Sequence, residues 1–143
     1  MSTVGTAKSA YQKSLIEKFA KDIKVLNVGT DKLVPLIEKG ENVDDVLEKE
    51  LEPFINQVDV LALGCTHFPL IKDKIQKILG SKVLVLDSGP AIARQVKRVL
   101  SKNRNLSKDG EAKREFYTTG NEELFNKILN KSLYNGKAER VTL

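Results

Sequence analysis

The sequence predicts an α/β fold built around a parallel β-sheet. Two short apolar runs, at 58–63 and 82–86, each lead through a brief polar loop into a segment with apolar residues at helical spacing. Strands that alternate with helices over short links are typical of parallel sheets, because each helix returns the chain to the same end of the sheet. A chain of 143 residues is long enough to bury the core of such a fold.

The first part of the chain is expected to contain three helices and one strand. Helical spacing of apolar residues predicts an amphipathic helix over 8–21, and a short apolar alternation predicts a strand over 23–28. A second helix is expected to end at Gly40, a typical C-terminal cap, and a third to start from the cap Asn42. The apolar faces of these helices comprise Tyr11, Leu15, Phe19, Leu33, Leu36, Ile37, Val43, Val46, Leu47, Leu51 and Phe54.

The middle of the chain carries the two apolar runs. Both are expected to be parallel strands buried on both faces, because they are almost uninterrupted. Pro69 suits the first turn of the helix after the first strand, which Gly80 ends, and 87–90 turns the second strand into another helix. The inner faces of these helices are expected to comprise Leu70, Ile71, Ile75, Ile78, Ile92, Val96, Val99 and Leu100.

The last forty residues predict a smaller set of elements. Residues 103–110 are polar and predict an exposed loop, and 115–119 has the pattern of a strand. Asn121 is expected to start a helix, and 139–143 to form a closing strand. The apolar face of that helix comprises Leu124, Phe125, Ile128 and Leu129.

Composition excludes several classes of protein. The one cysteine, Cys65, cannot form an intrachain disulfide and is too few for a structural zinc site, so no metal site is predicted. No window approaches the roughly 18 apolar residues that a spanning helix needs, and the first twenty residues do not have the pattern of a signal peptide. We therefore expect a cytoplasmic protein without a membrane partner.

The net charge of +5 is unevenly distributed along the chain. Residues 38–52 are mostly acidic, and residues 94–114 are mostly basic. A basic run is either a nucleic-acid footprint or a solvated helix end and loop. Because the run contains no aromatic residues to stack on bases, we expect the second and predict no nucleic-acid partner.

The only cysteine and the only histidine lie on one loop where this class of fold binds ligands. In open parallel sheets, ligands bind outside the carboxyl ends of the strands, here the loops 64–69 and 87–90. A thiol near a helix N-terminus has a lowered pKa, and a histidine two residues away can shuttle its proton. The alternatives are a packed, inert Cys65 and a His67 satisfied by a backbone carbonyl. A reactive pair would equally serve a hydrolase or a transferase.

Resemblance to a known family narrows these alternatives. Gly64-Cys65-Thr66-His67-Phe68-Pro69-Leu70 resembles the second cysteine motif of the glutamate racemases, in which an apolar strand runs into Gly-Cys-Thr-His. Other stretches resemble the same family in the same order along the chain. They are Gly5-Thr6 with Ser9 and Tyr11, Val34-Pro35-Leu36-Ile37-Glu38, residues 83–89 (VLVLDSG), and Phe116-Tyr117-Thr118-Thr119-Gly120.

The resemblance implies a role for each candidate site residue. Cys65 would be one of two cysteines on opposite sides of the α-carbon of glutamate, exchanging its proton without pyridoxal phosphate, another cofactor or a metal. His67 would assist Cys65, and His67 and Thr66 would bind the substrate. Glu38 would be either a supporting acid/base group or a solvated carboxylate. Weaker candidates for contact with the substrate are Thr6 and Ser9.

The resemblance also implies how the chain is organised. Residues 1–86 would form the smaller racemase lobe, nearly complete but without its first strand, and 87–143 would form the C-terminal part of a second α/β lobe. The family's first half, with the other cysteine, has no counterpart here. One base returns a proton to the face from which it came, so we predict little or no racemisation by this chain alone.

Several explanations of the missing half remain open. The chain is a fragment of a longer gene product, a half that pairs with a separate N-terminal half, or a descendant that has lost the activity. A homodimer with two Cys65 thiols across one substrate is a further possibility. The competing functions are an aspartate racemase, a non-catalytic binding or interaction protein derived from the racemase fold, and, ranked last, a Cys/His hydrolase.

Overall fold

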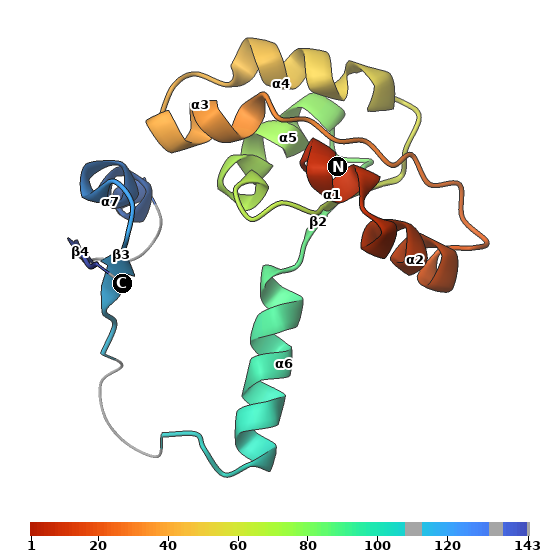
Figure 1. The fold of residues 1–143 in the computed structure, drawn as a ribbon. Coiled ribbons are helices and arrows are strands. Elements are labelled where there is room, and N and C mark those ends of the chain that lie inside the picture. Colours follow the sequence, from red (N-terminus) through yellow and green to blue (C-terminus); the bar gives the residue numbers. More distant parts are fainter. Residues whose placement is uncertain (108–112, 132–135, 143) are drawn as a thin grey trace. The chain divides into compact units, whose positions relative to one another are not determined.

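The computed structural model describes residues 1–107, 113–131 and 136–142, and it confirms the α/β class with parallel strands (Figure 1). Helices precede the first strand, and strands and helices alternate from β1 onward. The elements in order are α1 (Val4–Lys8), α2 (Ala10–Phe19), α3 (Leu33–Lys39), α4 (Asp44–Leu51), η1 (Glu52–Phe54), β1 (Val60–Leu63), η2 (Phe68–Ile71), α5 (Lys72–Leu79), β2 (Leu84–Asp87), α6 (Gly89–Lys102), β3 (Phe116–Thr118), α7 (Glu122–Lys131) and β4 (Ala138–Arg140), where η marks a 3₁₀-helix.

The chain divides into two compact units, each with its own parallel strand pair. The first comprises Met1–Ile37 and Glu41–Asp87, and the second comprises Glu38–Gly40 and Ser88–Leu143. In the first unit β1 pairs with β2, with Val60 opposite Leu84, and in the second β3 pairs with β4. The assignment of residues 1–86 and 87–143 to two racemase lobes stays a prediction.

The helix predicted over 8–21 forms as two short helices with a break at Ser9. The hydroxyl of Thr3 accepts a hydrogen bond from the amide of Thr6 and caps α1, and that of Ser9 accepts from the amide of Gln12 and caps α2. A side chain that satisfies an amide at a helix start favours a new helix at that point. The long amphipathic stretch is therefore divided.

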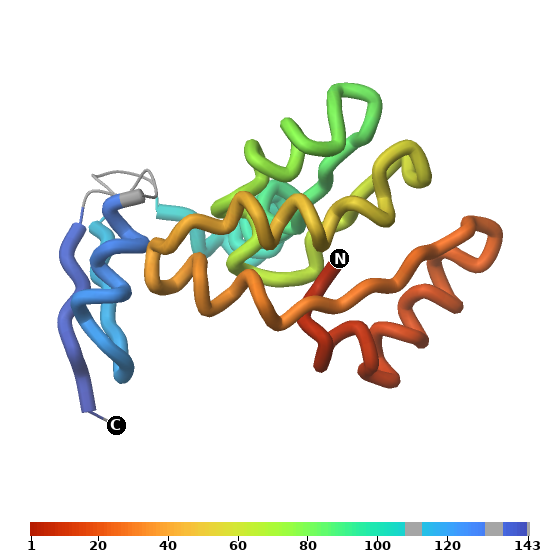
Figure 2. The backbone as a smooth tube through the Cα atoms, turned by 90° about the horizontal axis from the view of Figure 1, so that it is seen from above, coloured from red at the N-terminus to blue at the C-terminus, as the bar shows by residue number. Residues whose placement is uncertain are grey.

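The strand predicted over 23–28 is wrong. This segment runs as an extended stretch between α2 and α3 (orange in Figure 2), and within the described residues only Gly29, just after it, forms a bridge, to Ser2. Val25 and Leu26 are each 40% exposed. An alternating sequence fits the pleated backbone, but a strand needs a neighbouring strand to complete its hydrogen bonds.

The core of the first unit lies between one face of the β1–β2 pair and the helices. α3 and α5 end where Gly40 (φ 71°) and Gly80 (φ 80°) adopt the left-handed backbone that only glycine adopts easily. The amide of Asp44 donates to the side chain of Asn42 just before α4, but the cap residue of this helix is Val43 rather than the predicted Asn42. The buried apolar residues are Leu33, Ile37, Val43, Leu47, Leu51, Phe54, Leu61, Leu63, Phe68, Ile71, Ile75, Leu79, Val83 and Val85.

The prediction that both strands of this sheet are buried on both faces is wrong. Burial alternates along β1, and the outward-facing Val60, Leu84 and Leu86 are 49%, 56% and 45% exposed. Within the described part of this unit, helices cover one face only. A nearly continuous apolar run indicates that both faces of a strand can be buried, but whether another element covers the second face depends on the rest of the fold.

Pro69 lies in the 3₁₀-helix η2 rather than in the first turn of an α-helix, and α5 starts at Lys72. Leu70, expected on the inner face, is 46% exposed. A 3₁₀-helix has three residues per turn instead of 3.6, so a face counted at α-helical spacing rotates outward within it. The residues that follow in α5, Ile75 and Ile78, face the core as predicted.

In the second unit, α6 and α7 form where predicted, but the expected inner face of α6 is not covered. Ile92, Val96 and Val99 are 58%, 50% and 43% exposed. The amide of Leu124 donates to the side chain of Asn121 and confirms the predicted start of α7. The closing strand is β4, which lies slightly earlier than the predicted 139–143, and the last residue of that prediction is outside the described residues. The predicted loop 103–110 is exposed as far as residue 107, and its remainder is also outside the described residues.

Candidate active site

The loop that carries the cysteine motif follows β1 at its carboxyl end. The pairing of Leu63 with Asp87 places the start of this loop beside the carboxyl end of β2, as expected for neighbouring parallel strands. The amide of Gly64 donates to the carbonyl of Met1 over 2.8 Å. A Cβ on Gly64 would lie 3.2 Å from the Cβ of Ser2, so glycine permits this close approach of two backbone segments.

The side chains of Cys65 and Thr66 both lie close to one ring nitrogen of His67. The Sγ atom of Cys65 lies 4.0 Å from Nδ1 of His67, and the hydroxyl of Thr66 lies 3.4 Å from the same nitrogen. Cys65 is half-buried against the core, whereas Thr66 is exposed. A thiol hydrogen-bonded to an imidazole can pass its proton to the ring or recover it from the ring.

The backbone of this loop is fixed by its own hydrogen bonds and by one aromatic anchor. The amide of Phe68 donates to the carbonyl of Cys65 over 3.3 Å, and the amide of Leu70 donates to the carbonyl of His67 over 3.0 Å. Phe68 is fully buried in the core between these two turns. The loop thus holds Cys65 and His67 near the surface while its third side chain packs inward.

An ion pair that the sequence reading missed joins this part of the unit to β2. Nζ of Lys72, the first residue of α5, donates to Oδ2 of Asp87 over 2.6 Å, and the aspartate side chain is only 13% exposed. Asp87 is the last residue of β2 and Lys72 starts the helix after the cysteine loop. The pair ties the start of α5 to the strand that lies beside the loop.

The remaining predicted residues belong to other elements than the Cys65 loop: Thr6 lies in α1, Ser9 lies at the start of α2, and Glu38 lies in α3. Among the described contacts, the hydroxyls of Thr6 and Ser9 belong to the N-terminal helices: Thr6 lies 3.0 Å from the Thr3 hydroxyl, and Ser9 donates to the carbonyl of Thr6 over 2.8 Å. Glu38 is exposed near the end of α3. The substrate-binding roles of Thr6 and Ser9 and the acid/base role of Glu38 stay predictions.

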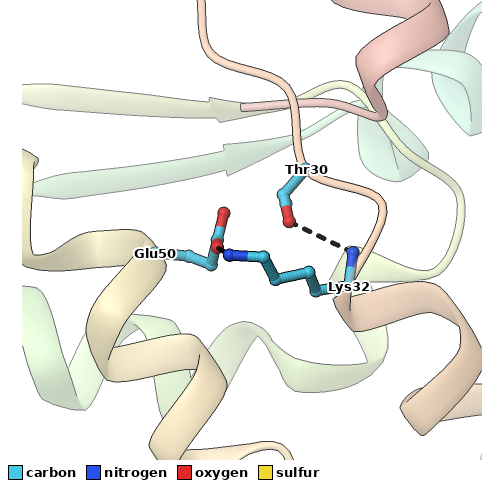
Figure 3. A network of polar contacts seen from close by, with 3 residues as sticks. All are labelled: Thr30, Lys32 and Glu50. Atoms are coloured by element: carbon cyan, nitrogen blue, oxygen red, sulfur yellow. Dashed lines mark hydrogen bonds and ion pairs between the residues drawn. The ribbon is translucent and has the colours of Figure 1, made fainter.

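A second polar network lies between α4 and the start of α3 (Figure 3). Nζ of Lys32 donates to Oε1 of Glu50 over 2.7 Å, and the amide of Lys32 donates to the hydroxyl of the buried Thr30. Burial raises the pKa of Glu50, but hydrogen bonds from Lys32 and Thr30 and the charge of Lys32 lower this pKa by more. The network therefore stabilises an ionised Glu50.

Comparison with known proteins places this arrangement in a family, although no family model matches the chain. The chain is 45% identical to the glutamate racemase of Vibrio parahaemolyticus over 120 residues, which are 81% of this chain. It is 36% identical to the glutamate racemase of Pseudomonas aeruginosa over 134 residues, which are 90% of this chain. The glutamate racemase isoform RacE1 of Bacillus anthracis superposes on 99% of the chain with a TM-score of 0.83 and 28% identity.

The chain belongs to the glutamate racemase family. It spans about half the length of the relatives it matches: 44% of the Vibrio parahaemolyticus glutamate racemase, 51% of the Pseudomonas aeruginosa one and 56% of the Bacillus anthracis structure. The Escherichia coli glutamate racemase, solved with L-glutamate and the activator UDP-MurNAc-Ala, matches 97% of this chain with a TM-score of 0.77 and 28% identity. No helix in the described ranges is long and apolar enough to cross a membrane.

Proposed function

We propose that this chain supplies one of the two acid/base thiols of a cofactor-independent glutamate racemase. The observation that carries the proposal is the 4.0 Å approach of the Cys65 thiol to Nδ1 of His67 on the loop after β1, in a chain of the glutamate racemase family. The Cys65 thiolate removes the α-proton of one glutamate enantiomer. A thiol on the opposite side of the α-carbon delivers a proton there, and the reverse reaction exchanges the two roles.

Each step of this exchange balances within the two thiols and the substrate. The α-carbon loses its C–H bond and Cys65 gains an S–H bond, while the opposite thiol loses its proton to the other face of the carbon. The carbanion between the steps is far more basic than a thiolate, so fixed hydrogen-bond donors must stabilise it. His67 returns Cys65 to the required protonation state, and the exposed Thr66 hydroxyl binds a substrate carboxylate together with His67.

The remaining candidate residues have supporting roles in this proposal. The hydroxyls of Thr6 and Ser9 bind the substrate when it replaces their present partners within the N-terminal helices. Glu38 acts as an acid/base or electrostatic group without touching the substrate. The product D-glutamate supplies cytoplasmic peptidoglycan synthesis, which is the role of the family. Aspartate is the alternative substrate.

The second thiol must come from residues other than these 143, because Cys65 is the only cysteine among them. The source that we propose is a polypeptide carrying the other half of a glutamate racemase, and a second copy of this chain is the alternative. The uncovered apolar side chains of Val60, Leu84 and Leu86 favour a second candidate function, a non-catalytic interaction protein. In that case the same surfaces bind a partner, but no glutamate is converted.

The proposal is tested with L-glutamate in D₂O, following loss of the α-proton by NMR and formation of D-glutamate by chiral chromatography. The isolated chain is expected to form little or no D-glutamate. Addition of the N-terminal part of the Vibrio parahaemolyticus relative, up to the region that this chain matches, is expected to restore racemisation. Cys65→Ser should abolish the restored activity, whereas Ser81→Ala, on the exposed turn before β2, should leave it unchanged.

Two results would count against this proposal. Racemisation by the isolated chain that disappears in Cys65→Ser would refute the requirement for a second polypeptide. Restored racemisation that persists in Cys65→Ser would show that this thiol is not an acid/base group. Repeating the assay with aspartate decides between the two substrates.

A further inference from the structure

Both ends of the loop that carries the candidate site are held at one residue, Asp87. We call residues 64–71 the site loop; it lies between the end of β1 at Leu63 and the start of α5 at Lys72. At its first end, the register of the parallel pair sets Leu63 opposite Asp87, and neighbouring strands lie about 4.8 Å apart. At its second end, Nζ of Lys72 donates to Oδ2 of Asp87 over 2.6 Å. The last residue of β2 therefore closes the site loop.

Lys72 lies at a position that a helix disfavours for a cation. It is the first residue of α5, and the N-terminal end of a helix carries a partial positive charge that repels a cation. The next residue, Asp73, has the negative charge that this end favours. The Lys72 side chain is nevertheless only 37% exposed, because it donates to the carboxylate of Asp87, which is 13% exposed. The ion pair, rather than the helix, accounts for a lysine at this position.

A second ion pair of α5 differs in what it joins. Lys74 pairs with Asp44, the first residue of α4, and these side chains are 48% and 50% exposed. Neither residue lies in the site loop or in β2. The two pairs therefore have the same chemistry on the same helix, but only the pair of Lys72 closes the site loop.

The contact that the site loop presents depends on its shape. Sγ of Cys65 and Nδ1 of His67 are 4.0 Å apart, which is long for a hydrogen bond to sulfur. The amides of Phe68 and Leu70 donate to carbonyls within the loop and fix its turns, but these bonds do not fix its ends. A displacement of about 1 Å between reacting groups can lower a rate by roughly a hundredfold. The two reactive side chains therefore stay within reach of each other only if the ends of the loop are held.

We infer that Lys72 and Asp87 form a clamp that closes the site loop and holds the Cys65 thiol within hydrogen-bonding distance of His67. Both are positioning residues, since they act on proton exchange through the loop. The clamp requires opposite charges at its two positions. Its effect on catalysis rests on the proposed function, whereas its effect on the contact between Cys65 and His67 is measurable in this chain alone.

The test follows the ring of His67, which is the only histidine of the chain, in a preparation without a histidine tag. The chemical shift of the Nδ1 nitrogen is recorded by NMR before and after Cys65→Ala, and the difference, the thiol effect, measures the contact. The thiol effect is then measured in Lys72→Met and in Lys74→Met, which each remove one positive charge from α5. We expect Lys72→Met to reduce the thiol effect to less than about half and Lys74→Met to change it by less than about a fifth, because only Lys72→Met opens the clamp.

Two further variants separate the charges of the clamp from a loss of folding. Lys72→Arg keeps the positive charge and should retain at least about three quarters of the thiol effect. Asp87→Asn keeps the size of the side chain but removes its charge, so it should act like Lys72→Met. If Lys72→Met does not fold, as judged by circular dichroism, Asp87→Asn replaces it in the comparison with Lys74→Met.

A kinetic measurement extends the test to catalysis. It uses the racemase restored with the N-terminal part of the Vibrio parahaemolyticus relative. Lys72→Met should lower kcat by about tenfold and change KM for glutamate by less than about twofold, since the clamp acts on Cys65 rather than on the substrate. Lys74→Met should leave both constants unchanged. A raised KM with unchanged kcat in Lys72→Met would overturn the positioning role.

The outcomes distinguish the clamp from the proposed function. An undiminished thiol effect in Lys72→Met would overturn the clamp, as would equal reductions in Lys72→Met and Lys74→Met or the absence of any thiol effect in the unaltered chain. A thiol effect that is lost in Lys72→Met, together with no racemisation by the restored protein, would leave the clamp standing and overturn the proposed function. Restored racemisation with an undiminished thiol effect in Lys72→Met would overturn the clamp alone.

Discussion

Phe68 anchors the cysteine loop, and its removal should destabilise the chain by an amount that the structure sets. The side chain is fully buried. Burial of a phenylalanine removes roughly 200 Å² from water, which at about 25 cal/mol per Å² amounts to about 5 kcal/mol. Alanine retains a small part of this, so Phe68→Ala should cost about 3–4 kcal/mol, within the range measured for such substitutions.

The assay is equilibrium unfolding in urea, monitored by circular dichroism. With a slope of about 1.5 kcal/mol per M, the loss would move the midpoint by roughly 2 M. Phe19→Ala is the matched control, because Phe19 is 70% exposed in α2 and its truncation should change stability by less than about 0.5 kcal/mol. The Cys65 thiol should also react faster with a thiol reagent in Phe68→Ala, since the loop loses its anchor.

Similar midpoints for the two phenylalanine variants would refute this reasoning. They would mean that Phe68 is not packed in solution as the structure places it, or that the loop contributes nothing to the stability of the first unit. A large loss in Phe68→Ala without faster thiol reaction would separate the two effects. The anchor would then stabilise the core but would not position Cys65.

Three further predictions concern polar contacts and backbone conformation. The lowered pKa of Glu50 means that the unfolded chain binds more protons at this site than the folded chain. The ionised carboxylate therefore stabilises the folded chain near neutral pH, and this stabilisation is lost as the pH falls below about 4. Glu50→Gln should reduce this loss of unfolding free energy by less than about 1 kcal/mol, measured from urea midpoints across pH. Lys72→Ala, which strips the largely buried carboxylate at the end of β2 of its ion pair, should cost about 1–2 kcal/mol in chemical unfolding, against at most about 0.5 for Lys74→Ala in a more exposed pair; equal losses would contradict this. Gly80→Ala should lower the midpoint of thermal unfolding, because φ is +80° at this residue, whereas Gly5→Ala within α1 should raise or preserve the midpoint. Neither added methyl group meets an atom within 4 Å. Equal effects of the two substitutions would therefore show that backbone conformation is not the cause.

The local pattern of the sequence predicted the elements well wherever each element contains its own signal. Asn121 marks a helix start, Gly40 and Gly80 mark helix ends, and each acts in the structure as its residue type implies. A cap is a contact within a few residues. Its energy therefore appears in the sequence directly, without knowledge of the remaining fold.

Burial was predicted less well, because it depends on what lies opposite a residue. Val60 and Val96 are apolar at the right spacing, yet both are exposed, since spacing identifies a face and not its cover. The segment 23–28 has the alternation of a strand, but among the described residues only Ser2 pairs with its end, at Val28 and Gly29. The predicted burial of Leu70 was wrong for a local reason, because the 3₁₀-helix at Pro69 changes the number of residues per turn.

The position of the candidate site was predictable from the order of elements, but its geometry was not. A parallel fold requires the loop after β1 to lie at the ligand-binding edge, and Cys65 and His67 are on that loop. The ion pair of Lys72 with Asp87 joins residues fifteen positions apart and depends on the register of β1 with β2. No spacing rule within one element contains that information.

One ring nitrogen of His67 lies within reach of both the Cys65 thiol and the Thr66 hydroxyl, and it carries at most one proton. In the proposed reaction, the two neighbours therefore compete for the same atom. A substrate carboxylate that engages the threonine hydroxyl withdraws one competitor and leaves the nitrogen to the thiol. Occupancy of the site and availability of this nitrogen to the thiol are then linked, so that the contact that binds the substrate also favours proton exchange between Cys65 and His67.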